Sequence, residues 1–285
     1  MRVLIFLGYK FIEFLAITTP YPISYLIALI VAKIVVLFNI NVDILKTNVS
    51  IVLNIDKNGK EVKRIVHRIY INWFFNVVDF LKLPIVLKEK LKNRVETVGL
   101  ENLDNALKKG KGVVIFTAHL GNFEWGACKV ALEGYKIWGT SVLRPYKRTN
   151  NFFESRRISK GVKTFYVNNL LHIFRILKNN EIIAIPTDWD SQGSARQYDF
   201  FGKKAYIPSG PVEIAMKSGA PLIPSFIRRK SKYNHFHVIE EPIELETEGD
   251  KKELIAINTQ KMIKVLEKYI REDIDQWEMF HNIWA

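Results

Sequence analysis

A histidine and a glutamate five residues apart, His119 and Glu124, are the residues of this chain best suited to acid–base chemistry. They lie in the stretch GVVIFTAHLGNFEWG at residues 112–126. Its short β-branched run predicts a strand buried on both faces at 113–116, and good helix formers predict a helix at 123–132. His119 is therefore expected where a strand ends and a helix begins, which is where ligands bind in open α/β sheets. A neutral imidazole there could take a proton from an alcohol.

Two other predicted strands also run into polar residues. The strand at 137–143 is followed by Arg144, and the strand at 181–186 leads to Asp188. Because the carboxyl ends of parallel strands share one edge of a sheet, we expect His119, Arg144 and Asp188 to converge there. An arginine in that position could bind phosphate or stabilise an oxyanion.

The sequence leaves open which carboxylate, Glu124 or Asp188, orients the imidazole of His119. Residues five apart do not share a helix face, so Glu124 can reach His119 only if His119 precedes the helix. The absence of a G-x-S-x-G motif favours direct transfer, in which an activated hydroxyl attacks an acyl thioester. The alternatives are a hydrolase that activates water and a membrane-peripheral binding protein in which both residues are structural.

Short strand and helix patterns alternate through the middle of the chain. This alternation predicts an α/β fold with a mostly parallel central sheet and helices on both faces. A long helix at 60–81 precedes the alternation, and another at 253–271 closes the chain. We expect one large domain at 41–285 behind a separate amino-terminal segment at 1–40.

The amino terminus is apolar at residues 1–16 and 23–38, with a break at Thr19-Pro20-Tyr21-Pro22. Neither run reaches the roughly 20 apolar residues of a spanning helix. A signal peptide is disfavoured because charges interrupt the first run and no small-x-small cleavage site precedes Pro20. A membrane-associated helical hairpin is favoured over a buried helix pair, because the rest of the chain would have to cover so many apolar residues.

The composition restricts the partners and the metals. A net charge of +13 indicates an acidic partner, such as an anionic membrane surface or an acidic carrier protein. The chain has no tail made only of Lys and Arg, so nucleic acid is not predicted as a partner. The single cysteine, Cys128, excludes a disulfide framework and is expected to be buried. His235 and His237 alternate and are expected on the exposed face of a strand, so no metal site is predicted.

Several motifs together resemble the lipid A late acyltransferases (lauroyl/myristoyl transferases), within the wider glycerolipid acyltransferases. HLGNFEWG resembles their HxGNWE form of the H-x4-D/E box. The chain departs from the family pattern at Trp189, Met279 and Asn282. The other similar segments are Leu143-Arg144-Pro145, Ile185-Pro186-Thr187-Asp188, Asp199-Phe200-Phe201-Gly202, Gly210-Pro211, Gly219-Ala220-Pro221 and Gln276-Trp277.

The resemblance implies transfer of a fatty acyl chain from acyl carrier protein or acyl-coenzyme A to a glycolipid hydroxyl. It implies no cofactor beyond that thioester, and a catalytic domain at the cytoplasmic face of the inner membrane. A lipid A precursor is the leading acceptor, and a phosphatidylinositol-mannoside-like glycolipid or another lysolipid is the alternative. The implied catalytic residues are His119 as general base, Glu124 and Asp188, and the implied substrate-binding residues are Gly121, Asn122, Arg144, Phe201 and Gly202.

Overall fold

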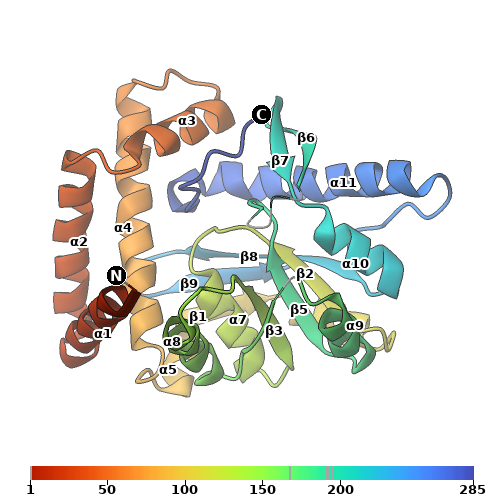
Figure 1. Ribbon diagram of the computed structural model, residues 1–285, viewed down its shortest axis with the longest axis horizontal. Helices are drawn as coiled ribbons and strands as arrows, with labels where there is room; N and C mark the ends of the chain where they lie inside the picture. Colours follow the sequence, from red (N-terminus) through yellow and green to blue (C-terminus); the bar gives the residue numbers. More distant parts are fainter. Residues whose placement is uncertain (1, 167, 191–192, 194) are drawn as a thin grey trace.

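A central sheet organises the computed structural model, which describes residues 2–166, 168–190, 193 and 195–285 (Figure 1). Within these residues seven strands follow the order β1-β9-β8-β2-β5-β3-β4, and every neighbouring pair is parallel except β8 and β9. The predicted α/β fold with a mostly parallel sheet is confirmed. The strands are β1 (Val95–Val98), β2 (Val113–Thr117), β3 (Ile137–Ser141), β4 (Lys163–Tyr166), β5 (Ile182–Pro186), β8 (Leu222–Arg229) and β9 (His235–Ile239).

Strand β2 lies at the centre of the sheet and is buried on both faces. Val113 and Ile115 pack in the core on one side, and Val114 and Phe116 pack in the core on the other. Helices supply the apolar residues of both cores, as the near-continuous apolar run predicts. The first side carries α5 (Lys88–Arg94), α6 (Leu100–Leu107) and α7 (Phe123–Leu132), and the second carries α9 (Leu170–Lys178), α10 (Gly210–Ser218) and α11 (Lys251–Glu272).

The predicted amino-terminal hairpin is formed by α1 (Arg2–Thr18) and α2 (Tyr21–Leu37), with Pro20 at the break. Helix α2 packs along the long helix α4 (Lys60–Lys82), and α3 (Val42–Leu53) connects the two (Figure 1). Because α2 and α4 pack together, the division of the chain at residue 40 stays a prediction. Helix α8 (Lys147–Ile158) contacts α1 through an ion pair between Arg156 and Glu13, which ties the amino-terminal hairpin to the α/β part of the chain.

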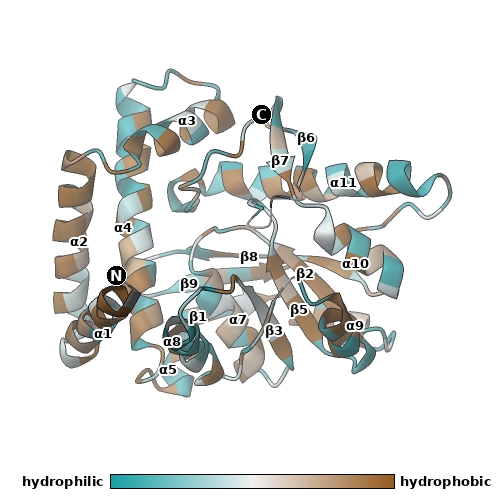
Figure 2. Ribbon diagram, viewed as in Figure 1, coloured by the Kyte–Doolittle hydropathy of each residue, from teal (hydrophilic) through white to brown (hydrophobic). Residues whose placement is uncertain are grey.

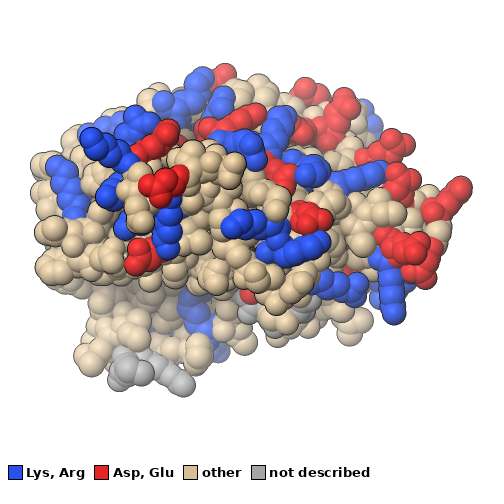
Figure 3. Space-filling view, turned by 90° about the horizontal axis from the view of Figure 1, so that it is seen from above, with Lys and Arg blue, Asp and Glu red and all other residues tan. Residues whose placement is uncertain are grey.

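The hairpin exposes a large apolar surface, brown in Figure 2. In Figure 3, charged side chains gather on the upper part of the face, whereas the left and lower-left part, where α2 and α1 lie, is largely uncharged. Among the described residues, only the bent pair of α2 and α3 has the length and composition of a candidate span. The exposed apolar residues are Val3, Leu4, Ile5, Leu7, Phe11, Ile12, Phe14 and Leu15 on α1 and Ile23, Leu26, Ile27, Ile30, Ile34 and Leu37 on α2.

The segment at 199–205 forms part of an antiparallel hairpin of β6 (Arg196–Phe200) and β7 (Lys203–Ile207). Its two-residue turn is Phe201-Gly202, and both residues have a positive φ, as a type I′ turn requires. After the short helix η1 (Ile274–Gln276), the carboxyl-terminal segment returns to the sheet, where Trp277 bridges to Leu120. This return brings the end of the chain against the loop that follows β2.

Candidate active site

His119 lies in the loop between β2 and α7, as its sequence position predicts. Gly121 has a φ of +57°, and a Cβ atom there would lie 2.0 Å from the carbonyl oxygen of Ile227 in β8. Only glycine therefore allows the loop to approach β8 so closely. The side chain of Asn122 then caps α7 by accepting a hydrogen bond from the backbone N–H of Trp125. These two residues fix the loop that carries the histidine.

Asp188, at the end of β5, is the carboxylate that contacts the imidazole. Its Oδ1 lies 2.8 Å from Nδ1 of His119, and its Oδ2 accepts the backbone N–H of His119 at 2.9 Å. Trp277 Nε1 donates to the same Oδ2 at 2.9 Å, and Asp188 is fully buried. Nδ1–H therefore points at the carboxylate, which leaves Nε2 as the nitrogen able to accept a proton. Within the described part of the chain no residue hydrogen-bonds to that nitrogen, and the His119 side chain is 28% exposed.

The two groups shift each other's pKa. Burial by itself lowers the pKa of His119, but the charge and the hydrogen bond of Asp188 outweigh it, so the pKa is raised overall. Burial favours the neutral form of Asp188, yet His119 and the donated N–H groups hold the pKa of this carboxyl below its usual value. The pair therefore favours a carboxylate that stabilises the imidazolium form.

Glu124 contacts an arginine and makes no hydrogen bond to the imidazole within the described chain. Arg157 of α8 donates from Nε to Oε2 at 2.9 Å and from Nη2 to Oε1 at 2.6 Å. Both side chains are mostly buried, and this bidentate geometry is that of a strong ion pair. The sequence left open which carboxylate contacts the imidazole of His119. In the structure Asp188 makes that contact, and Glu124 pairs with Arg157.

Asp79 of α4 forms a buried polar cluster that the sequence analysis did not identify. Its carboxylate accepts hydrogen bonds from the Tyr25 hydroxyl at 2.6 Å, from Asn122 Nδ2 at 3.0 Å and from Arg229 Nη2 at 2.7 Å. These partners come from α2, the α7 cap and β8. The cluster therefore connects the amino-terminal hairpin to the loop beside His119. A polar residue inside the apolar stripe of α4 is the signal that could have revealed it.

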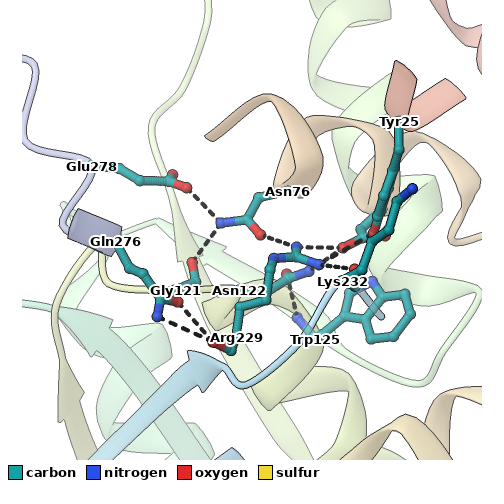
Figure 4. Close-up of polar contacts among 10 residues, drawn as sticks. Tyr25, Asn76, Gly121, Asn122, Trp125, Arg229, Lys232, Gln276 and Glu278 are labelled. Atoms are coloured by element: carbon teal, nitrogen blue, oxygen red, sulfur yellow. Dashed lines mark hydrogen bonds and ion pairs between the residues drawn. The ribbon is translucent and has the colours of Figure 1, made fainter. Parts of the chain in front are cut away.

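Asn76, one helical turn before Asp79, extends this cluster toward Gly121 and Glu278 (Figure 4). Its Oδ1 accepts from Arg229 Nη2 at 2.5 Å, so its Nδ2 is directed the other way. Nδ2 donates to the Gly121 carbonyl at 2.8 Å and to Glu278 Oε1 at 2.5 Å. The backbone N–H of Glu278 in turn donates to the carbonyl oxygen of His119 at 2.7 Å. Glu278 is thus a second acid beside the histidine.

A cavity of about 1760 Å³ opens in front of His119. It is larger than the roughly 300–1,000 Å³ of ordinary small-molecule sites, which suits lipid-sized ligands. It extends from the α1–α2–α4 helices to α9 and α10, which lie at opposite ends of the sheet in Figure 1. Its apolar lining includes Ile12, Leu15, Ala16, Ile27, Val31, Trp73, Phe74, Val77 and Leu81 on one side and Leu170, Ile173, Phe174, Ile214, Met216 and Ile255 on the other.

The structure brings some of the other predicted site residues to the cavity. Gly121, Asn122, Glu124 and Arg144 line it, and the guanidinium of Arg144 lies 4.0 Å from the ring centre of Phe153. The predicted convergence of His119, Arg144 and Asp188 at one sheet edge is therefore observed, with Asp188 buried behind His119.

Phe201 and Gly202 do not line the cavity. They form the tight turn of the β6–β7 hairpin, and the Phe201 N–H donates to Glu267 of α11 at 2.5 Å. These two residues therefore have a structural role and not the predicted substrate-binding one, because the turn needs their positive φ angles.

The prediction that His235 and His237 are exposed is wrong. Both are buried, because β9 lies inside the sheet and α7 covers that face: the Trp125 ring packs against His235. His237 shares a hydrogen bond of 2.8 Å with the Ser225 hydroxyl. Cys128 is buried, as predicted. Among the described residues, no group of three or more His, Cys, Asp or Glu side chains could hold a metal ion.

Comparisons with known proteins identify the group to which this architecture is related. The family model described as "Bacterial lipid A biosynthesis acyltransferase" matches residues 1–285. A phosphatidylinositol mannoside acyltransferase of Mycobacterium tuberculosis is 26% identical over 214 residues, which span 72% of this chain and 66% of that protein. The phosphatidylinositol mannoside acyltransferase of Mycolicibacterium smegmatis is 26% identical over 153 residues, or 51% of this chain and 50% of that one.

One solved structure is also similar, at a TM-score of 0.38 and 16% identity. It is the 1-acyl-sn-glycerophosphate acyltransferase PlsC from Thermotoga maritima, and the similarity covers 87% of this chain and 97% of that chain.

Proposed function

Because this chain belongs to the bacterial lipid A biosynthesis acyltransferase family, we propose that it transfers a fatty acyl group from a thioester to a hydroxyl of a membrane glycolipid. The observation that carries this proposal is the His119–Asp188 pair at the wall of a large apolar cavity. A general base beside an apolar channel suits a reaction in which a long acyl chain and a hydroxyl must meet away from bulk water.

The proposed reaction has two proton transfers through one nitrogen. Nε2 of His119 takes the proton of the acceptor hydroxyl as its oxygen attacks the thioester carbonyl carbon. Asp188 stabilises the imidazolium that forms, and the developing oxyanion lies near the amino terminus of α7. The intermediate then expels the thiolate, which takes the proton back from Nε2. The products are an ester and a free thiol, and the histidine returns to its starting state.

We assign Glu124 and Arg157 to the wall of the cavity. The ion pair joins the first turn of α7 to α8, and both residues line the cavity. By its charge, Arg157 also suits a phosphate or carbonyl oxygen of a substrate. Arg144, on the same wall, offers a second guanidinium.

The acceptor proposed is a glycolipid, either a lipid A precursor or a mannosylated phosphatidylinositol. The family description supports the first, and the curated relatives support the second. The donor is the thioester of acyl carrier protein or coenzyme A, and the net charge of +13 favours an acidic donor and anionic lipid. The exposed apolar residues of α1 and α2 would rest in the inner membrane, with the catalytic domain on the cytoplasmic side.

Purified full-length protein in detergent provides the test. It is incubated with palmitoyl-coenzyme A or palmitoyl-acyl carrier protein and, in turn, with a lipid A precursor, a phosphatidylinositol mannoside and no acceptor. Mass spectrometry should detect an added palmitoyl ester on one glycolipid and little free palmitate without acceptor. Palmitate release at the same rate without acceptor would instead identify a thioester hydrolase.

A further inference from the structure

Glu278 is an acidic side chain of the cavity that the mechanism above does not use. It lines the cavity, and its backbone N–H is bonded to the carbonyl oxygen of His119. Asn76 donates to one carboxyl oxygen, Oε1, and none of the described residues hydrogen-bonds to the other. A carboxyl group beside the catalytic base thus offers one oxygen to a ligand in the cavity.

Hydrogen bonds through Asn76 and Arg229 fix the orientation of the Glu278 carboxyl. Arg229 donates to Asn76 Oδ1, which forces Asn76 Nδ2 toward Gly121 and Glu278 (Figure 4). Because both protons of that amide are used, Asn76 cannot turn without losing hydrogen bonds. The carboxyl is therefore preorganised in the absence of a ligand.

The position of Glu278 favours the acceptor as its ligand. Asn76 belongs to α4, which lines the end of the cavity near α1 and α2. Ile12 and Ile27 in that region both line the cavity and are exposed, so the cavity opens on the apolar face of the hairpin. Glu278 and His119 line the same cavity, so both can contact a lipid acceptor that enters from that face.

Resting on the function proposed above, we propose that Glu278 is a positioning residue that selects a polyhydroxylated acceptor. Its free oxygen bonds a second hydroxyl of the sugar, next to the hydroxyl that His119 activates. An acceptor with one isolated hydroxyl cannot make this contact, so the site discriminates against it.

The charge state of Glu278 agrees with a role in hydrogen bonding to a sugar hydroxyl. Burial raises the pKa of its carboxyl to about 8, although the Asn76 amide, His119 and Arg229 act in the opposite direction; Asp188 adds to the rise. At pH 7 the free oxygen therefore carries a proton in most molecules and can donate as well as accept a hydrogen bond. A glutamine at this position has the same shape and keeps a donor there.

Two soluble acceptors test the proposal, hexyl β-D-glucopyranoside and 1-hexanol. In full-length His119→Ala protein, which does not turn over, the tryptophans of the cavity report binding of each ligand by fluorescence. Adding Glu278→Ala should weaken glucoside binding about tenfold, the value of one hydrogen bond, and change hexanol binding by less than twofold. Adding Glu278→Gln instead should keep glucoside binding within about threefold of the parent. Glu272→Ala, a change of an exposed glutamate, is the matched control.

Turnover gives the second readout. With His119 present, Glu278→Ala should raise the KM for the glucoside about tenfold and change kcat by less than threefold. Equal weakening of both ligands, or no weakening of either, would overturn the role of Glu278. A wild-type protein that binds the glucoside through Glu278 but transfers no acyl group would overturn the proposed function alone.

Discussion

Asp188 accepts two hydrogen bonds from one residue, since His119 donates to it through both its backbone N–H and its imidazole Nδ1. The two contacts fix the position of the histidine backbone and the plane of its ring together. Trp277, from the end of the chain, adds a third donor to the same carboxylate. The catalytic geometry therefore depends on three segments far apart in sequence.

Replacing this carboxylate should cost far more activity than stability. We expect Asp188→Asn to lower kcat by about 10²–10⁴-fold, because an amide stabilises neither the productive tautomer nor the imidazolium. Steady-state acyl transfer by the folded variant measures this effect. A variant that keeps more than about a tenth of the wild-type kcat would contradict the catalytic part given to Asp188.

The pH dependence of transfer should reveal the raised pKa of His119. The base must be deprotonated, so kcat/KM should rise with pH through a limb that lies above the ordinary histidine value of about 6.5. Besides Asp188, the charge of Glu124 also favours the protonated form of this imidazole, and Glu278 does so wherever its own carboxyl is ionised. Asp188→Asn removes the largest of these charges and should move the limb to lower pH. Initial rates from pH 5 to 9 provide the comparison, and an unmoved limb would argue that another group titrates.

Gly121→Ala should destabilise the fold. The added Cβ would meet the Ile227 carbonyl oxygen at 2.0 Å, and the residue has a positive φ, so we expect a loss of at least about 2 kcal/mol in the free energy of unfolding. Gly110→Ala is the matched control, because Gly110 also has a positive φ but no atom lies within 4 Å of an added Cβ. That change should cost only about 1 kcal/mol. Chemical denaturation of both variants tests the difference, and equal losses would mean that the close approach to β8 is unimportant.

The apolar face of α1 should drive membrane binding. Replacing Leu4, Phe11 and Phe14, which are exposed, by serine should lower partition onto vesicles of phosphatidylethanolamine and phosphatidylglycerol by at least about tenfold. Vesicle sedimentation measures it. Serine at Leu171 and Ile257, which are also exposed but lie on α9 and α11, provides the control and should leave partition unchanged. Equal losses in both sets would refute a specific membrane face.

The sheet and the place of the histidine could be predicted because they follow from local patterns. The apolar run of β2 predicted burial on both faces, and the helix formers at 123–132 placed His119 between that strand and α7. Parallel strand ends then brought Arg144 and Asp188 to the same edge. These inferences needed only periodicity and the geometry of parallel sheets.

Contacts between distant segments could not be predicted in this way. Spacing alone suggested Glu124 as a partner for His119, but the position of Arg157 on α8 decides where Glu124 points. The alternation of His235 and His237 showed that they share a strand face, yet not that α7 covers it. Helices α3 and α5 were missed, since their helical signals are short.

The departure from the family pattern at Trp189 has a structural counterpart. Its ring stacks on His281 with centroids 4.0 Å apart and lines the cavity. The change therefore replaces a polar wall by an aromatic one near His119.

The central claim is that His119 activates a glycolipid hydroxyl for direct attack on a thioester. The most direct test compares wild-type and His119→Ala proteins in a single turnover with [¹⁴C]palmitoyl thioester and the glycolipid acceptor. We predict label in the glycolipid for the wild type, at least a thousandfold slower transfer for the folded variant, and no labelled protein intermediate in either. Transfer by the variant at a rate near that of the wild type, or label trapped on the wild-type protein, would contradict the account.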